Sequence, residues 1–332
     1  MQYHWVMDLL KDFNAIEPTP VIRRPDYSAL RKELPALDFA CDQPLPGSVA
    51  SYRTYYHLNF DEAAGTGIGT FKAAGFELVA QYWLVAEPRG TLFICHGYFD
   101  HTGIYGAAIR YGLQRGFNVV AVDFPGHGLS SGEPVAIDTF LQYREVLEAL
   151  LRRAQGKVPE PWHGLGQSTG GATLLSYLQF SLWQPFDKIM LLAPLVRPAN
   201  WHLRKWMFYL GRYLMPRPSR GFNINTHDAE FARRQAHRDP LQSPVMSIRW
   251  LGAMVDWLKV FPKTHRNRRP ILVVQGTDDQ TVDWRYNMRV IRDRFPNSKR
   301  VIIRGARHQM INETQPYRQQ ILAALDAWLD QP

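Results

Sequence analysis

Segments typical of buried strands alternate with segments typical of helices over most of this chain. We predict strands over 52–60, 76–84, 91–95, 117–123, 188–193, 271–275 and 300–304, with a weaker strand just before Gly166. Helices are predicted over 103–115, 138–153, from Gly166 to residue 182, 285–295 and 314–329. Such alternation with short connections builds a mostly parallel central sheet with helices on both faces, so the expected fold class is α/β.

Two parts of the chain fall outside this alternation. Residues 1–50 contain six of the chain's prolines and little periodicity, which predicts an N-terminal arm with one short helix over 3–14. Residues 195–269 carry helical patterns alone, at about 200–214 and 245–260. We therefore assign 51–194 and 270–332 to one core, and we call 195–269 the inserted segment.

The positive charge of the chain is concentrated in the inserted segment. Between Leu195 and Pro270, 15 Lys and Arg residues stand against 4 Asp and Glu, whereas the whole chain has a net charge of +9. Ten aromatic residues lie in the same stretch. This mixture fits a nucleic-acid strand, an anionic lipid headgroup or a membrane interface. On charge alone, solvated helices whose aromatic side chains pack on the core are the preferred interpretation.

The ends and the cysteines of the chain exclude other classes of protein. No run of 18 or more apolar residues occurs, and the N-terminal stretch has Asp8 and Asp12 instead of a basic start and an apolar block. We therefore expect no membrane-spanning helix, no cleaved secretory signal and a soluble, cytoplasmic protein. Cys41 and Cys95 are too few for a disulfide framework or a zinc cluster.

The strongest local motif is G-x-S-x-G, at residues 166–170, which is followed by a predicted helix. In a turn of this kind the serine, here Ser168, stands above the end of a strand, and the glycines let strand and helix approach closely. The start of the helix also directs backbone N–H groups toward a developing oxyanion. The alternative is a chance glycine-rich turn, because the pattern is undemanding and residues 159–164 make a poor strand.

A serine nucleophile needs a base and an acid that orients the base, and both types of residue follow in the order found in α/β-hydrolases. The apolar strand predicted over 271–275 runs into a turn with Asp278 and Asp279. The strand predicted over 300–304 ends in a loop with His308. Both loops follow the carboxyl ends of strands, where parallel sheets place their chemistry. The alternatives are that Asp279 caps a helix and that His308 is one of 11 histidines without a special role.

Four blocks of sequence resemble the α/β-hydrolase superfamily, and within it the monoglyceride lipase and lysophospholipase branch. They are FICHGYFDH at 93–101, DFPGHGLS at 123–130, the Ser168 turn, and GARH at 305–308. The resemblance covers residues 52–330 and implies an α/β-hydrolase fold in which residues 195–269 are the helical cap. Gln167 and Thr169 depart from the histidine and methionine that often flank the serine, which leaves the exact subfamily open.

The resemblance also implies a role for each site residue. Ser168 matches the nucleophile and His308 the base. Asp279 matches the acid, because the family places a glycine three residues before it and a valine three after, and Asp278 is the fallback. The backbone N–H groups of Tyr98 and Thr169 match the oxyanion hole. No cofactor and no metal are implied.

We therefore expect a serine hydrolase that cleaves a carboxylic ester through an acyl-enzyme, with a lysophospholipid or a monoacylglycerol as substrate. The inserted segment also offers a surface for peripheral contact with an anionic membrane, and nucleic acid is not expected as a partner. A small-ester carboxylesterase and a proline iminopeptidase-like peptidase remain open within the same scaffold. From another class, a catalytically silent binding protein on a hydrolase fold remains open.

Overall fold

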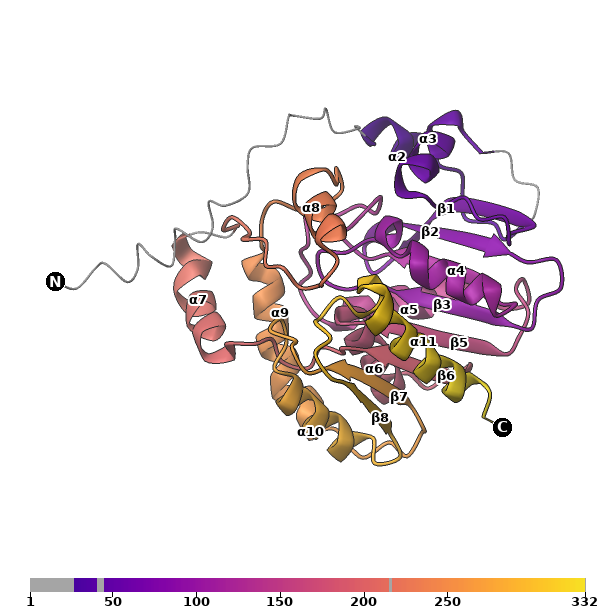
Figure 1. The fold of residues 1–332 in the computed structure, drawn as a ribbon. Coiled ribbons are helices and arrows are strands. Elements are labelled where there is room, and N and C mark those ends of the chain that lie inside the picture. The colour runs from indigo at the N-terminus through magenta and orange to yellow at the C-terminus, as the bar shows by residue number, and fades with distance from the viewer. Residues whose placement is uncertain (1–26, 41–44, 215–216, 332) are drawn as a thin grey trace.

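A twisted sheet of eight strands organises the computed structural model, which describes residues 27–40, 45–214 and 217–331 (Figure 1). The order of the strands across the sheet is β1-β2-β4-β3-β5-β6-β7-β8. All pairs from β4 to β8 are parallel, and β2 pairs antiparallel with β1 and β4. The strands are β1 Gly65–Ala73, β2 Phe76–Leu84, β3 Thr91–Cys95, β4 Asn118–Asp123, β5 Trp162–Gln167, β6 Phe186–Leu192, β7 Leu272–Gly276 and β8 Lys299–Ile303. The predicted mostly parallel α/β sheet is confirmed.

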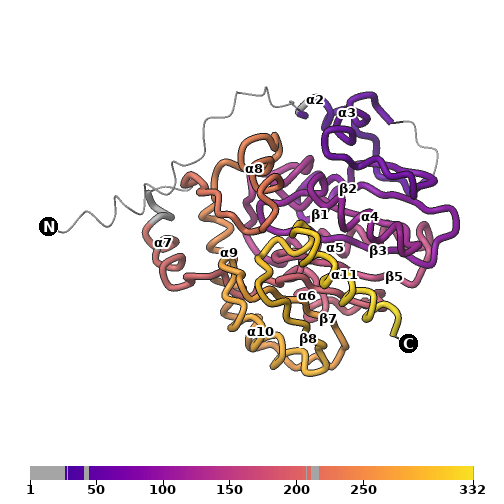
Figure 2. The backbone as a smooth tube through the Cα atoms, viewed as in Figure 1, coloured from indigo at the N-terminus to yellow at the C-terminus, as the bar shows by residue number. Residues whose placement is uncertain are grey.

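Helices cover both faces of the sheet (Figures 1 and 2). One face is covered by α4 Gly106–Gln114 and α11 Gln315–Leu329, and the other by α5 Leu141–Ala154 and α6 Thr169–Phe180. Helix α10 Trp284–Arg294 follows β7. Successive side chains of β4 point to opposite faces of the sheet. Val120 and Val122 pack on the α5–α6 side, and Val119 and Ala121 pack on the α4–α11 side. This alternation of side chains buries the strand on both faces and produces its continuous apolar run.

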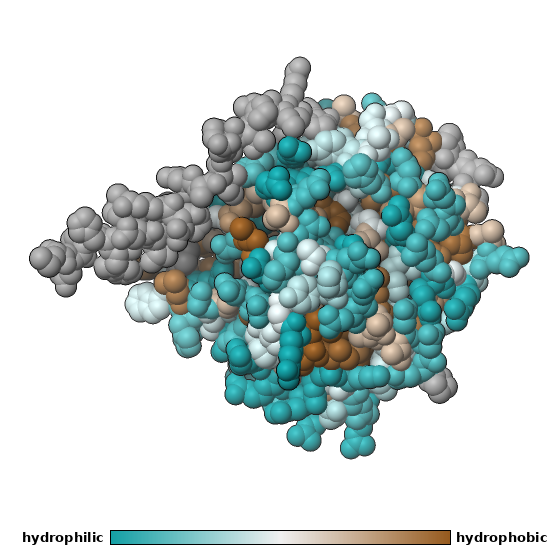
Figure 3. All heavy atoms as spheres, viewed as in Figure 1, coloured by the Kyte–Doolittle hydropathy of each residue, from teal (hydrophilic) through white to brown (hydrophobic). Residues whose placement is uncertain are grey.

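The stretch between β6 and β7 holds three helices, α7 Trp201–Leu214, α8 Ala229–His237 and α9 Ile248–Val260. Helix α9 is bonded to the core, because Trp250 Nε1 donates to Tyr143 Oη at 3.1 Å and Trp257 Nε1 donates to Ser176 Oγ at 3.0 Å. Helix α7 packs against α9 and leaves an apolar side exposed. The face of the molecule drawn in Figure 3 is mostly hydrophilic, and apolar side chains are visible over α7 at its left.

Two predictions of secondary structure are wrong. The stretch 52–60, predicted as a strand, lies largely in helix α3 Gly47–Tyr56. Val49, Tyr52 and Tyr56 recur on one face of this helix and are buried, so the aromatic residues that suggested a strand follow a helical period. Strand β1 is not predicted at all, because three of its first five residues are glycine and carry no side chain that alternates.

The N-terminal region is only partly described. Its described part includes α2 Ser28–Glu33 and the start of α3, so residues 27–40 and 45–50 contain more helix than the predicted arm. Tyr27 contacts Tyr52 with ring centroids 5.4 Å apart, which packs this region on α3. The short helix predicted over 3–14 lies outside the described residues. Among the described helices, none has the length and the apolar character that a bilayer span requires.

Candidate active site

Ser168 lies at the sharp turn between β5 and α6. Its backbone has φ 53° and ψ −113°, a left-handed conformation that is strained for a residue with a side chain. Strand β5 is buried along its whole length although residues 159–164 make a poor strand in sequence. At Gly170, an added Cβ would lie 1.9 Å from the carbonyl oxygen of Cys95, so only glycine allows α6 to approach β3 this closely.

His308 and Asp279 meet at the same end of the sheet, in the loops that follow β8 and β7. His308 Nδ1 lies 2.8 Å from Asp279 Oδ2, and both side chains are buried. The other carboxylate oxygen of Asp279 accepts hydrogen bonds from the backbone N–H groups of Thr281 at 2.9 Å and Val282 at 3.1 Å. The neighbouring Asp278 is exposed and accepts from a threonine hydroxyl instead. Of the two candidate acids, Asp279 is therefore the one that orients His308.

The Asp279–His308 pair keeps its charged forms despite burial. Desolvation by itself would raise the pKa of the Asp279 carboxyl, but His308 and the donors around the carboxylate hold that pKa below its ordinary value. Desolvation would likewise lower the pKa of the His308 ring, and the Asp279 carboxylate raises it above the ordinary value. The acid is thus ionised over the neutral range, and the imidazolium that forms during proton transfer is stabilised.

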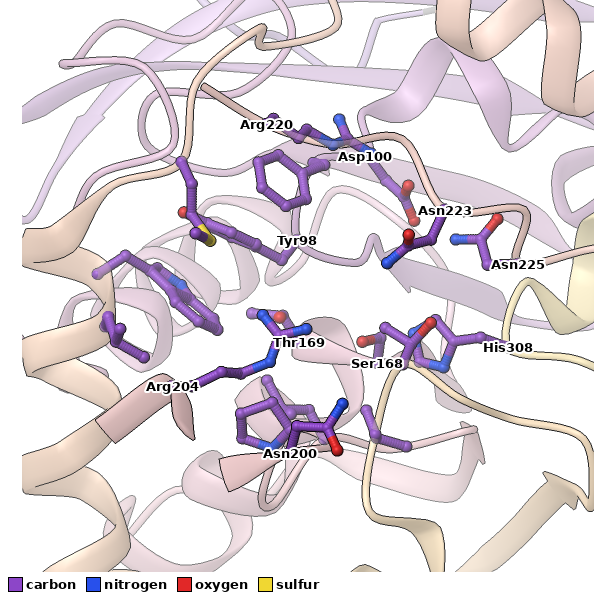
Figure 4. A pocket seen from close by; sticks show the side chains of 18 of the residues that line it. Tyr98, Asp100, Ser168, Thr169, Asn200, Arg204, Arg220, Asn223, Asn225 and His308 are labelled. Atoms are coloured by element: carbon purple, nitrogen blue, oxygen red, sulfur yellow. The ribbon is translucent and has the colours of Figure 1, made fainter. Parts of the chain in front are cut away.

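Ser168 and His308 line the same cavity, which has a volume of about 360 Å³ (Figure 4). Figure 4 shows the two side chains next to each other on one wall of this cavity. Because His308 Nδ1 is hydrogen-bonded to Asp279, the other ring nitrogen, Nε2, is the one available to a reacting hydroxyl. Ser168, His308 and Asp279 are therefore arranged in the order that activation of a serine nucleophile would require.

The backbone N–H groups of Tyr98 and Thr169 are free to receive an oxyanion. In the part of the chain that the structure describes, neither N–H donates to another protein group. Thr169 is the first residue of α6, where N–H groups have no partner within the helix. Tyr98 is fixed from the other side, since its ring stacks on Trp250 with centroids 3.9 Å apart. Both residues line the cavity beside Ser168.

Gln167 occupies the position of the expected histidine and binds the loop that carries His308. Its Nε2 donates to Gln309 Oε1 at 2.7 Å, and its Oε1 accepts from the N–H of Ile311 at 3.2 Å. Gln309 Nε2 in turn donates to Asp100 Oδ1 at 2.9 Å. These buried hydrogen bonds hold Gln309, the residue after His308, in place, so Gln167 helps to fix the loop that carries His308.

Several residues of the cavity are not predicted from the sequence. They are Asp100, Asn200, Arg204, Arg220, Asn223 and Asn225, and Figure 4 shows them around the cavity that contains Ser168. Most belong to the inserted segment, where one-dimensional patterns do not tell which polar residues turn inward. Asp100 is the one of these residues that lies in a block already singled out in the sequence, FICHGYFDH, so that block could have pointed to it. Within the described ranges there is no cluster of three or more His, Cys, Asp or Glu residues that could hold a metal ion.

Comparison with known proteins identifies the family of the chain. Residues 86–315 match the Hydrolase_4 family, described as serine aminopeptidase, S33. A monoglyceride lipase homolog of Monkeypox virus is 25% identical over 264 residues, which are 76% of this chain and 94% of that protein. The phospholipase YtpA of Bacillus subtilis is 23% identical over 258 residues, or 75% of this chain and 98% of that protein.

The fold is also found in solved structures. A soluble variant of monoglyceride lipase from Saccharomyces cerevisiae, solved in complex with a substrate analog, superposes with a TM-score of 0.68 at 20% identity. The likeness covers 79% of this chain and 94% of that one. Since the family match spans more than half of the 332 residues, the chain belongs to the Hydrolase_4 (serine aminopeptidase, S33) family of α/β-hydrolases and is monoglyceride lipase-like.

Proposed function

We propose that this hydrolase cleaves carboxylic esters through an acyl-enzyme formed on Ser168. The observation that carries the proposal is the 2.8 Å contact between Asp279 and His308 beside Ser168, in one cavity. Ser168 Oγ attacks the ester carbonyl carbon while His308 Nε2 takes its proton. The tetrahedral oxyanion accepts hydrogen bonds from the N–H groups of Tyr98 and Thr169.

The second half of the cycle releases both products. The bond to the alcohol oxygen breaks, and the alcohol leaves with the proton from His308. A water molecule then attacks the acyl-enzyme while His308 takes its proton, and the carboxylic acid leaves as Ser168 regains a proton. Asp279 stays ionised throughout and keeps the ring of His308 in one tautomer.

The proposed substrates are lysophospholipids or monoacylglycerols. The cavity walls include Leu195, Met246, Trp250 and Leu251, which give an acyl chain an apolar surface next to Ser168. The relatives named monoglyceride lipase and phospholipase support the same substrate class.

We also propose that α7 contacts an anionic membrane surface, where such substrates reside. Leu203, Trp206 and Leu210 are each more than half exposed on this helix, and Lys205 lies among them. Replacing both Trp206 and Leu210 with alanine should reduce co-sedimentation with vesicles that contain phosphatidylglycerol. Binding as strong as that of the unchanged protein would contradict this contact.

The peptidase alternative is favoured by the family description alone. In a peptidase that recognises a free amino terminus, we expect the cavity to contain a carboxylate that is not already held by protein donors. Asp100 is the aspartate that lines it, but both its oxygens already accept hydrogen bonds, from Tyr105 at 3.0 Å and from Gln309 at 2.9 Å. Asp239 of the inserted segment is bound to His101 at 2.9 Å. Ester hydrolysis is therefore the better supported of the two proposed activities.

A hydrolysis panel with matched serine variants tests the proposed function. The substrates are a lysophospholipid, a monoacylglycerol, a short nitrophenyl ester and a proline-initiated peptide amide. Ser168→Ala should lower kcat on esters by several orders of magnitude, up to roughly 10⁶-fold. Ser181→Ala, at the opposite end of α6, is the control and should keep full activity. Equal activity of Ser168→Ala and the unchanged protein would refute the mechanism, and turnover of the amide alone would refute the ester assignment.

A further inference from the structure

Arg204 is a residue of α7 whose side chain turns away from the solvent and into the cavity that holds Ser168. Its Nε donates to the backbone carbonyl of Ala199 at 2.9 Å, which fixes the direction of the guanidinium. Figure 4 shows the guanidinium near Thr169, across the cavity from His308. The two terminal nitrogens of the guanidinium thus face the space in which a substrate would lie.

No carboxylate neutralises Arg204 within the described parts of the chain. Other arginines of the inserted segment have such partners: Arg197 with Asp283, Arg217 with Glu133, and Arg249 with Glu133 and Asp138. Burial lowers the pKa of Arg204, and no acidic neighbour offsets this effect. Arg204 differs in this respect from these three arginines.

Arg220, the second arginine of the cavity, provides the comparison. Burial lowers its pKa to about 10, and the nearby Asp100 carboxylate acts in the opposite direction. Its guanidinium lies 3.7 Å from the ring centroid of Phe99 and donates to Gln242 Oε1 at 2.6 Å. Arg220 is therefore held by protein groups, whereas Arg204 keeps hydrogen-bond donors for a ligand.

A guanidinium keeps its charge in proteins, so a partly desolvated one without a counter-charge is unfavourable until an anion binds. Its planar set of donors matches the two oxygens of a carboxylate or a phosphate. A neutral glycerol or acyl group supplies no charge to this position.

We propose that Arg204 binds an anionic oxygen group, a carboxylate or a phosphate, on the ester substrate. The preferred substrates are then anionic acyl esters, and neutral monoacylglycerols are poorer ones. The proposal rests on the proposed function, since it assigns the substrate class of the same site. The anion belongs either to the alcohol part, as in a lysophospholipid phosphate, or to the acyl part, as in the half-ester of a dicarboxylic acid.

Two matched pairs of substrates test this proposal and separate the two sources of charge. The first pair is 1-decanoylglycerol 3-phosphate and 1-decanoylglycerol, and the second is 4-nitrophenyl hydrogen adipate and 4-nitrophenyl hexanoate. All are used as monomers at one ionic strength. The unchanged enzyme should show a kcat/KM at least about tenfold higher for the anionic member of one pair, as one charge-assisted hydrogen bond provides.

Three variants of the inserted segment complete the test. Arg204→Gln should abolish the preference by lowering kcat/KM for the anionic member about 10- to 100-fold while the neutral member stays nearly unchanged. Arg204→Lys should recover part of the preference, because it keeps the charge and loses the planar set of donors. Arg266→Gln removes one charge from an exposed position of the same inserted segment and should leave the preference intact.

Each outcome bears on the proposal. A preference for the neutral member in both pairs, or an equal loss on both members in Arg204→Gln, would overturn it. If Ser168→Ala hydrolyses all four esters at the unchanged rate, the proposed function itself fails. Loss of all activity in Ser168→Ala, together with no preference for charge in the parent enzyme, refutes the role of Arg204 alone.

Discussion

The buried ion pair of His101 and Asp239 joins the inserted segment to the core. His101 Nε2 lies 2.9 Å from Asp239 Oδ2, and neither side chain is more than 2% exposed. Asp239 Oδ1 also accepts from Tyr56 Oη at 2.6 Å and from the N–H of Leu241 at 3.0 Å. One carboxylate therefore binds the loop after β3, helix α3 and its own segment.

Asp239→Asn removes the charge from this junction at nearly constant volume. His101 then loses its counter-charge, and the amide must direct an NH₂ group toward donors. Removing one partner of a buried ion pair destabilises a protein by about 3 kcal/mol or more. Asp256→Asn is the matched control, because Asp256 pairs with Lys259 on the exposed side of α9, where such pairs contribute little.

The loss of stability in Asp239→Asn should depend on pH in a defined way. Desolvation opposes the charge on both residues, but Asp239 raises the pKa of His101 above 6.5, and His101 lowers the pKa of Asp239 below 3.8. A raised histidine pKa adds stability that is full below pH 6.5 and is lost as the pH rises through the folded value. A lowered aspartate pKa adds stability that is full above pH 3.8 and is lost as the pH falls through the folded value. The pair therefore contributes most between these limits.

Equilibrium unfolding in urea at pH 5.5 and pH 9 measures this dependence. The difference in unfolding free energy between the parent protein and Asp239→Asn should be about 3 kcal/mol at pH 5.5 and smaller at pH 9. Asp256→Asn should match the parent at both values. A difference below about 1 kcal/mol at pH 5.5, or one of equal size at both pH values, would refute the assignment of a charged pair.

Three further outcomes are expected. Asp279→Asn should lower kcat by about 10⁴-fold while Asp278→Asn keeps near-parental kinetics, and the reverse result would move the acid to the other residue. The acidic limb of the kcat/KM profile should have its midpoint above pH 6.5, because Asp279 raises the pKa of His308 and the base must be neutral; a midpoint below 6.5 in stopped assays would contradict this. Gly170→Ala should lower the thermal midpoint because its Cβ meets the Cys95 carbonyl, whereas Gly47→Ala, with no atom within 4 Å, should not; equal midpoints would show that the turn relaxes without loss.

Most of the parallel part of the fold can be predicted because β3, β4, β6 and β7 contain apolar runs, whereas β5 has a weak pattern in sequence. Such runs arise when side chains on both faces are buried, and β4 and β7 illustrate this. The antiparallel edge is different. Strand β1 carries glycines, and the neighbouring α3 carries aromatic residues at helical spacing, so local composition favours the wrong state at both places. Tertiary packing determines the secondary structure of β1 and α3, and a local sequence pattern carries no information about that packing.

The candidate site divides in a similar way. Ser168, Asp279 and His308 follow strand ends, so a sequence pattern that finds the strands also finds these residues. The resemblance favours Asp279 over Asp278, and the structure adds the direction of each carboxylate, since Asp279 contacts His308 and Asp278 is exposed. Arg204 lies on a helix whose exposed and inward faces both carry basic and apolar residues, so its position in the cavity could not be read from periodicity.

The charge of the inserted segment shows how a count along the chain differs from a distribution in space. Arg217 and Arg249 contribute to the positive excess, yet both bind Glu133, and Arg249 also binds Asp138, which are residues of the core. These pairs neutralise charge across the boundary between the two parts of the chain and weaken the field that the local excess suggests. A polyanion would meet a surface that is already partly neutralised. Among the described residues Arg204 has no such partner, and it faces the cavity. We therefore expect charge recognition by this protein to act on a single substrate group inside the site.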